Sequence, residues 1–338
     1  MKIETSLIND YKGLADTCSD WSSRKSLWGV APVAPIHLGL DSLVLLQKEA
    51  IRLGVKRHYL IIADFHALMT KGISWRESRA RSYYYEFYFK EVCQLENTDF
   101  LLGSFFQTRP DYVEELYSSL RDISLSKVRE TMPSLAKNRT VYSFVAVYAL
   151  MQCLDIFHVN ANYVLAETAQ KKIYDLVPDI SNSFIQRTGI ERNFTTGLNK
   201  MSFAYIKPAH DILGQNLNVS SSGTRISIHE SESSLLKKVK RISIPAQTDP
   251  SSTNPLLDTF KYSVFPWFDF IQIKCLNGVT KEYYKYEDFE FDYYHKVFHS
   301  IDAKSELYEK LKMRISKTQN LMAKGISNWI NIDKAAGI

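Results

Sequence analysis

The sequence predicts an α/β fold with a parallel sheet, and two observations lead to that prediction. A strand, a turn, a helix and a second strand follow one another between residues 28 and 63, which is the order of a βαβ unit. The second strand, residues 59–63 (YLIIA), is a continuous apolar run, as expected of a strand buried on both faces of a parallel sheet. Ligands of such sheets bind at the carboxyl ends of the strands.

The elements follow in order along the chain. Residues 28–35 (WGVAPVAP) predict a strand that ends in a proline-broken turn, and helical apolar spacing predicts a helix from Asp41 that Gly54 caps. Further helices are expected over 74–95, 112–129, 141–157, from about 170, and over 305–329, with strands at 164–166 and 202–206. The elements up to residue 206 indicate a Rossmann-like sheet.

Composition excludes several classes of protein. The 338 residues are 45% hydrophobic and 23% charged, which is typical of a globular chain. A net charge of +5 permits a polyanionic partner without requiring one. No run approaches the ~18 apolar residues of a membrane span, and the first ten residues lack a signal-peptide core. We therefore expect a cytoplasmic protein with no membrane partner.

The four cysteines are scattered and have no histidine cluster near them. This pattern predicts neither a disulfide framework nor a protein-bound metal. Only 13 of the residues are glycine, so a glycine-rich phosphate loop is not expected.

The first candidate site is the segment PIHLGL at residues 35–40. His37 stands at the amino end of the predicted helix, where unpaired N–H groups and a partial positive charge suit phosphate. Gly39 would let a ligand approach the backbone. A histidine there can donate a hydrogen bond as charge develops at phosphorus. The alternative is a histidine that only caps a turn.

Two further candidates are polar segments. Tyr148, Gln152 and Asp155 share one face of an otherwise apolar helix, where burying them would be unfavourable without a function; the alternative is a solvent-facing stripe. Residues 218–224 (NVSSSGT) offer many hydroxyl and N–H donors, although serine-rich linkers look similar.

The ordered series of segments resembles the class I aminoacyl-tRNA synthetases of the tyrosyl/tryptophanyl subclass, closest to the archaeal–eukaryotic type of tyrosyl-tRNA synthetase. GVAP at 29–32 with IHLG at 36–39 resembles the HIGH element, and LIIADFHA at 60–67 resembles the strand that follows it. YALMQCLDI at 148–156 is similar to the pocket helix, QKKI at 170–173 to the next helix start, and NVSSS at 218–222 to the KMSKS loop. The literal KMS at 200–202 comes before the strand that precedes this loop and is not the signature.

The resemblance implies a catalytic domain over 1–247, with a helical insertion at about 72–140 and the signature loop at 218–225, and a helical, anticodon-binding-like domain over 248–338. It implies an aminoacyl-tRNA ligase that uses ATP and Mg²⁺, binds tRNA and forms a homodimer, with Tyr83, Tyr84 and Phe87 near the dimer contact. Its implied catalytic residues are His37, Ser220, Ser221 and Ser222; its ATP-binding residues are Pro35, His37, Gly39, Leu40, Val219 and Arg225; its amino-acid-binding residues are Leu27, Gly29, Ala31, Asp64, His66, Tyr148, Gln152, Asp155 and Gln170.

Several positions depart from the family pattern. Leu40 replaces the second histidine of the HIGH element, and Asn218 and Ser221 replace the two lysines of the loop. Removing one such donor typically raises a barrier by ~3–4 kcal/mol. Leu27 and Ala31 replace the tyrosine and the acid of the side-chain pocket, and a pocket without a hydroxyl partner discriminates poorly between tyrosine and phenylalanine.

Three hypotheses therefore follow from the sequence. The first is an aminoacyl-tRNA ligase, with tyrosine or a related amino acid as substrate. The second is a paralogue that passes the activated amino acid to another acceptor. The third is a non-catalytic module that binds tRNA or an amino acid. Arg225, Lys237 and Lys238 are the cations that could replace the missing lysines.

Overall fold

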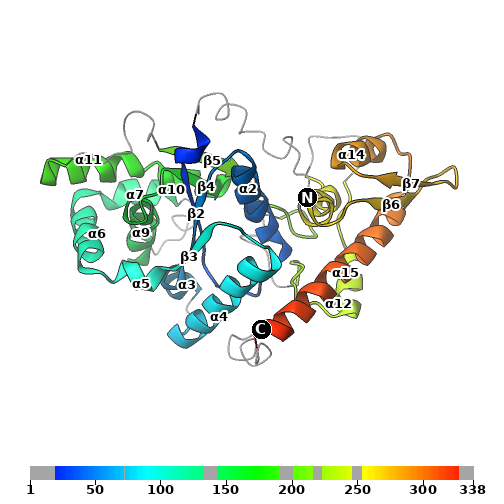
Figure 1. The fold of residues 1–338 in the computed structure, drawn as a ribbon, viewed down its shortest axis with the longest axis horizontal. Coiled ribbons are helices and arrows are strands. Elements are labelled where there is room, and N and C mark those ends of the chain that lie inside the picture. Colours follow the sequence, from blue (N-terminus) through cyan, green and yellow to red (C-terminus); the bar gives the residue numbers. More distant parts are fainter. Residues whose placement is uncertain are drawn as a thin grey trace. The chain divides into compact units, whose positions relative to one another are not determined.

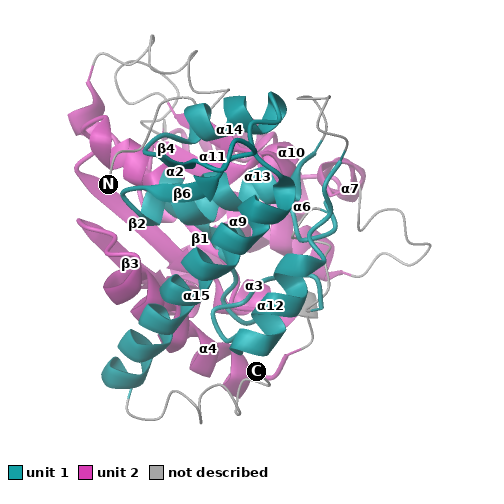
Figure 2. Cartoon of the chain, turned by 90° about the vertical axis from the view of Figure 1, so that its right-hand side faces the viewer, with its two compact units in different colours: residues 1–7, 35–45, 208–328 teal, residues 8–34, 46–207, 329–338 magenta. Residues whose placement is uncertain are grey.

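The structure is a computed structural model that describes residues 20–71, 73–132, 143–190, 201–215, 223–245 and 253–326. The chain forms two compact units, coloured separately in Figure 2. Unit 1 contains residues 35–45 and 208–328, and unit 2 contains residues 8–34 and 46–207, besides the chain ends. The expected domain boundary at 247/248 lies outside the described residues.

Unit 2 contains a five-stranded sheet in the order β3-β2-β1-β4-β5 (Figure 1). Its strands are β1 (Lys25–Val30), β2 (Arg57–Ile62), β3 (Thr98–Leu102), β4 (Tyr163–Glu167) and β5 (Ser202–Ile206). Every neighbouring pair is parallel, which confirms the predicted fold class. Strands β2 and β3 extend the sheet from one edge of β1, and β4 and β5 extend it from the other edge. The topological switch point therefore lies between β1 and β4.

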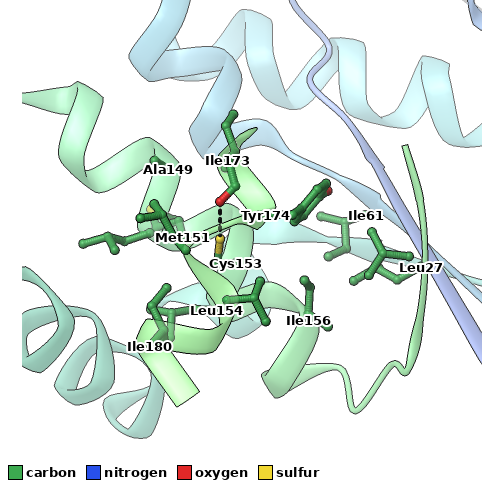
Figure 3. Close-up of a cluster of buried hydrophobic side chains, with 14 of the residues drawn as sticks. Leu27, Ile61, Ala149, Met151, Cys153, Leu154, Ile156, Ile173, Tyr174 and Ile180 are labelled. Atoms are coloured by element: carbon green, nitrogen blue, oxygen red, sulfur yellow. Dashed lines mark hydrogen bonds between the residues drawn. The ribbon is translucent and has the colours of Figure 1, made fainter. Parts of the chain in front are cut away.

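Helices cover both faces of this sheet. On one face the helices α6 (Pro110–Asp122), α7 (Leu125–Thr131), α9 (Phe144–His158) and α11 (Val177–Thr188) share a core with the sheet. Figure 3 shows part of that core, in which Leu27 and Ile61 of the sheet and Tyr174 lie around α9. On the other face Phe89 packs edge-on against Trp28, with ring centroids 5.2 Å apart.

The other described α-helices of unit 2 come after a strand or, in one case, after another helix. They are α3 (Asp64–Lys71), α4 (Trp75–Phe87), α5 (Gly103–Gln107) and α10 (Lys171–Tyr174). α4 starts at a capping box between Ser74 and Glu77 and continues into a π-helical turn, Tyr88–Val92. Helix α2 (Asp41–Arg52) begins in unit 1 and continues in unit 2.

Two segments differ from expectation. The helix predicted at 112–129 is two helices, because Ser124 accepts a hydrogen bond from the Lys127 N–H (3.3 Å) and starts α7. The segment 72–140, expected to be a helical insertion, also contributes β3 to the sheet.

Unit 1 is mainly helical. It contains α12 (Glu232–Lys240), α13 (Pro255–Thr259), α14 (Tyr286–Tyr294) and the long helix α15 (Ser300–Gly325). Between α13 and α14 an antiparallel hairpin of β6 (Ile271–Lys274) and β7 (Thr280–Tyr283) adds strands that we did not predict. Phe289 lies at the centre of the aromatic core, 4.5 Å from the ring of Phe260 and 5.3 Å from that of Phe298. Among the described helices of the chain, none has the length and apolar character of a membrane span.

Candidate active site

The HIGH-like segment of unit 1 contains a 3₁₀ turn, Leu38–Leu40, that His37 caps. We call it the signature turn. The backbone of His37 is extended, and its Nδ1 accepts a hydrogen bond from the Gly39 N–H at 3.2 Å. Burial, together with the positive charge of Arg225, lowers the pKa of His37 to about 3. The imidazole is therefore neutral at physiological pH.

The signature turn is joined to the segment that follows the signature loop. Ile226 accepts a hydrogen bond from the Leu38 N–H (3.0 Å), and Ile36 accepts one from the Ile228 N–H (3.1 Å). The Ser227 hydroxyl also donates to the Ile36 carbonyl at 3.0 Å. His37 and Ser227, 190 residues apart along the chain, thus form an isolated antiparallel bridge. Candidate residues Val219, Ser220, Ser221 and Ser222, and Asn218, lie outside the described residues.

The residue after the turn, Asp41, is held by a buried ion pair. Arg314 of α15 contacts both carboxylate oxygens at 2.6 Å, and the Ser263 hydroxyl donates to Oδ2 at 2.7 Å. The guanidinium also lies 3.8 Å from the ring centroid of Trp267. This cluster ties helix α15 to the first residue of α2. Sequence spacing could not reveal it, because the partners are 273 residues apart.

Lys238, one of the cations suggested as a replacement for the missing lysines, already has partners within the fold. The Lys238 ammonium contacts Glu230 Oε1 and the Arg225 carbonyl, both at 2.5 Å. Lys238 therefore stabilises the chain at the end of the signature loop and just after it. Position 40 is a leucine in the turn and provides no side-chain donor.

In unit 2 the candidate residues of α9 lie beside the sheet. Asp155 is only 5% exposed. Gln107 Nε2 donates to its oxygens at 2.8 and 3.1 Å, and the Tyr112 hydroxyl donates to Oδ1 at 2.8 Å. Burial raises the pKa of Asp155 to about 7, although both partners stabilise the ionised form. Sequence analysis missed Gln107 and Tyr112, which stand more than 40 residues before Asp155.

The structure also brings together Tyr148 and His66. Their rings meet edge to face with centroids 4.5 Å apart. Burial lowers the pKa of His66 to about 4 and raises that of Tyr148 to about 12, so both rings are neutral at physiological pH. Gln152 is half-buried on the same helix, and Gln170 ends the short turn that follows β4.

Three candidate residues belong to β1 or follow it. Leu27 is buried in the core of Figure 3. Gly29 pairs with Ile61 of β2, and Ala31, just after the strand, packs against the same core. Leu27 and Ala31 present only apolar groups.

The carboxylate of Asp64 stabilises the fold. Its Oδ1 accepts hydrogen bonds from the Ser104 N–H (2.8 Å) and the Phe65 N–H (3.0 Å), and its Oδ2 accepts one from the Ser104 hydroxyl (2.6 Å). Arg79 lies 3.7 Å from Oδ2. The carboxylate thereby joins the carboxyl ends of β2 and β3.

A third residue that we did not predict is Glu167, the last residue of β4. It stands at the carboxyl end of a strand beside the switch point, and burial raises its pKa to about 7. A polar residue directly after an apolar strand is the signal that could have found it.

The five-stranded parallel sheet with its switch point defines a doubly wound α/β protein. The chain belongs to the class I tRNA synthetases for tryptophan and tyrosine, because the family model "tRNA synthetases class I (W and Y)" matches residues 22–316. It is by family an aminoacyl-tRNA ligase.

Similar proteins include several tyrosine–tRNA ligases of archaea. The chain is 28% identical to that of Halorubrum lacusprofundi over 322 residues, covering 90% of this chain and 92% of the relative. It is 26% identical to that of Methanopyrus kandleri, covering 82% of each chain.

Solved structures share the fold. The tyrosyl-tRNA synthetase of Archaeoglobus fulgidus, complexed with L-tyrosine, superposes with a TM-score of 0.75 at 24% identity, covering 88% of this chain and 90% of that one. The enzyme of Aeropyrum pernix superposes with a TM-score of 0.76 at 21% identity, covering 96% and 92%.

Proposed function

We propose that the chain is a cytoplasmic enzyme that activates tyrosine, or an amino acid of similar shape, with ATP and transfers it to tRNA. The observation that carries the substrate assignment is the carboxylate of Asp155, buried on α9 and oriented by Gln107 and Tyr112. An oriented acceptor in an apolar pocket suits a substrate with one donor at the far end of its side chain, such as a phenol.

In the proposed complex, Tyr148, Gln152 and Gln170 hold the α-ammonium group through their oxygens. Asp155 accepts the hydrogen bond of the phenol, and Leu27 and Ala31 contact the ring. Gly29, Asp64 and His66 belong to the same site as shaping residues. His66 packs on Tyr148, and Asp64 joins the strand ends next to it.

The first chemical step is a displacement at phosphorus. A carboxylate oxygen of the amino acid attacks the α-phosphorus of ATP, the bond to the β-phosphate oxygen breaks, and pyrophosphate leaves. In the second step a ribose hydroxyl of tRNA attacks the carbonyl carbon of the aminoacyl-adenylate, loses its proton and displaces AMP.

We propose that the signature turn and loop hold the nucleotide. Pro35, His37, Gly39 and Leu40 line its phosphate side from the turn, and Val219 and Arg225 do so from the loop. Ser220, Ser221 and Ser222 supply hydroxyl donors to the leaving pyrophosphate. Mg²⁺ would enter with the phosphates.

Amino-acid-dependent exchange of labelled pyrophosphate into ATP tests this proposal. We expect exchange with tyrosine, weaker exchange with phenylalanine, and a loss of about 10-fold or more with tyrosine in Asp155→Asn, because a charged acceptor is replaced by a neutral one. Asp292→Asn in unit 1 is a matched control that should leave exchange unchanged. No exchange with any amino acid would leave only a binding module, and exchange without charging of total tRNA would indicate another acceptor.

A homodimer is the proposed assembly. On α4 and α5 three exposed aromatic side chains, Trp75, Tyr83 and Phe105, surround Arg79 at 5.2 to 5.7 Å from its guanidinium. Tyr84 is fully buried and belongs to the fold instead. Light scattering should give twice the monomer mass, and Tyr83→Glu should halve it; a monomeric wild-type chain would contradict the assembly.

A further inference from the structure

One carboxylate of unit 1 has an oxygen that the fold does not use. Asp211 follows β5 and is 3% exposed. Its Oδ1 accepts hydrogen bonds from the backbone N–H groups of Leu213 and Gln215, both at 2.9 Å, so this oxygen shapes the turn. Its Oδ2 is buried and accepts no hydrogen bond within the described part of the chain. Leaving a buried carboxylate oxygen without a donor is unfavourable.

This carboxylate lines a small cavity at the signature turn. Leu38 and Gly39 of the turn form one wall, and Asp258 of α13 forms another. The volume is about 20 Å³. That space holds one water-sized group, such as an amino group or a hydroxyl, but not a purine ring.

Charge decides which part of a nucleotide can enter. Two carboxylates, Asp211 and Asp258, line the cavity, and the second is already paired with the Nδ1 of His210 at 2.5 Å. The negative charge of a phosphate would be repelled strongly by these two carboxylates inside a buried cavity. The cavity therefore excludes a phosphate. A neutral donor is attracted, because a hydrogen bond to a charged acceptor is stronger than one to a neutral acceptor.

We propose that Asp211 Oδ2 accepts a hydrogen bond from the nucleoside half of ATP and thereby selects and orients the nucleotide beside Gly39. The donor is the exocyclic amine of the base or a ribose hydroxyl, the two neutral donors of ATP. This inference rests on the proposed function, since it takes ATP as the nucleotide held by the signature turn. Asp211 is then a specificity residue that turns the triphosphate away from the two carboxylates.

Calorimetric titration of the full chain with nucleotide analogues tests the inference. The panel is ATP, purine riboside triphosphate, which lacks the amine, and 2′-deoxy- and 3′-deoxy-ATP, which each lack one hydroxyl. We expect one of these analogues to bind about 10- to 100-fold more weakly than ATP, the range of one charge-assisted hydrogen bond. Equal affinity for all four would overturn the inference and would indicate that only a water fills the cavity.

Two variants connect the loss to Asp211. Asp211→Asn keeps an oxygen for the turn while it replaces the second acceptor with an N–H donor. It should abolish the difference between ATP and the weak analogue, and, where the amine is the donor, it should favour inosine triphosphate, whose base carries an oxygen at that position. Asp258→Asn removes the same charge from the same cavity and should leave the difference between ATP and the weak analogue unchanged. A full difference between analogues in Asp211→Asn would contradict the assignment.

Pyrophosphate exchange separates failure of this inference from failure of the proposed function. Exchange with ATP, together with equal binding of all analogues, would reject only the role of Asp211. Neither exchange nor nucleotide binding would reject the proposed function, and the inference with it.

Discussion

The candidate residues of unit 1 and those of unit 2 differ in chemical character. In unit 2, Tyr148, Gln152 and Gln170 are polar groups of the type that the family resemblance implies for the ammonium site. In unit 1, the signature turn has a leucine at position 40, and the cavity beside it is lined by carboxylates. Unit 2 keeps side chains of the family's type, so substituting them tests amino-acid recognition. The signature turn lacks the family's second histidine, so nucleotide analogues are the more direct test of nucleotide recognition.

The largest expected effect lies in unit 1. Replacing Arg314 with methionine leaves the buried carboxylate of Asp41 without its cation, which should reduce the free energy of unfolding by about 3–5 kcal/mol. It should also raise the KM for ATP more than the KM for the amino acid, because Asp41 directly follows the signature turn. Urea denaturation and exchange kinetics measure the two effects.

The control is an ion pair of similar chemistry in unit 2. Arg57 and Asp99 pair at 3.1 Å, but both side chains are at least half exposed. Arg57→Ala should therefore change the free energy of unfolding by less than about 1 kcal/mol and leave both KM values unaltered. Equal effects of the two substitutions would show that Arg314 has no special role at the turn.

The next effect is a pH dependence that belongs to unit 2. The pKa of Asp155 is about 7 in the folded chain and close to 4 in an unfolded one. Between these values the folded state binds the additional proton, so the contribution of Asp155 makes the free energy of unfolding fall as pH rises from 4 to 7, by at most about 4 kcal/mol. Below 4 and above 7 this contribution is constant.

The measurement is the difference in unfolding free energy between the wild type and Asp155→Asn across pH 4 to 8. Taking the difference removes the contributions of His37 and His66, whose lowered pKa values act in the opposite direction. A difference that does not change with pH would show that Asp155 stays ionised in the folded chain.

A smaller effect comes from Gly103, where α5 begins. A methyl group at this position would lie 2.8 Å from Gln107 Oε1 and 3.2 Å from Asp64 Oδ1. Gly103→Ala should therefore displace Gln107 from Asp155, lower stability by about 1–3 kcal/mol, and weaken amino-acid binding more than ATP binding. Calorimetric titration with both ligands checks this, and an equal loss for the two would contradict it.

The sheet could largely be predicted from the sequence, because its strands carry local signals. The apolar run at 59–63 corresponds to β2, and the strand predicted at 202–206 has the bounds of β5. Strand β3 was missed because only its last three residues are apolar, a run too short to predict a strand. The β6–β7 hairpin had a signal that we did not use, since Asn277 and Gly278 form the dipeptide typical of tight hairpin turns.

The site could be predicted only in part. Tyr148, Gln152 and Asp155 follow from helical spacing along one segment. Gln107, Tyr112 and Arg314 could not be found in this way, because they reach their partners through the fold and not through a period in the sequence. The serines of the signature loop remain a prediction, as they lie outside the described residues.

The cap that His37 places on its own turn has one more consequence. With Nδ1 engaged by the Gly39 amide, the single ring hydrogen resides on Nε2, and a ring that resists protonation down to about pH 3 has no second hydrogen to offer. Such a group acts as a fixed dipole and not as an acid that relays protons. Its contribution to the reaction should accordingly be the same in mildly acidic and mildly alkaline solution.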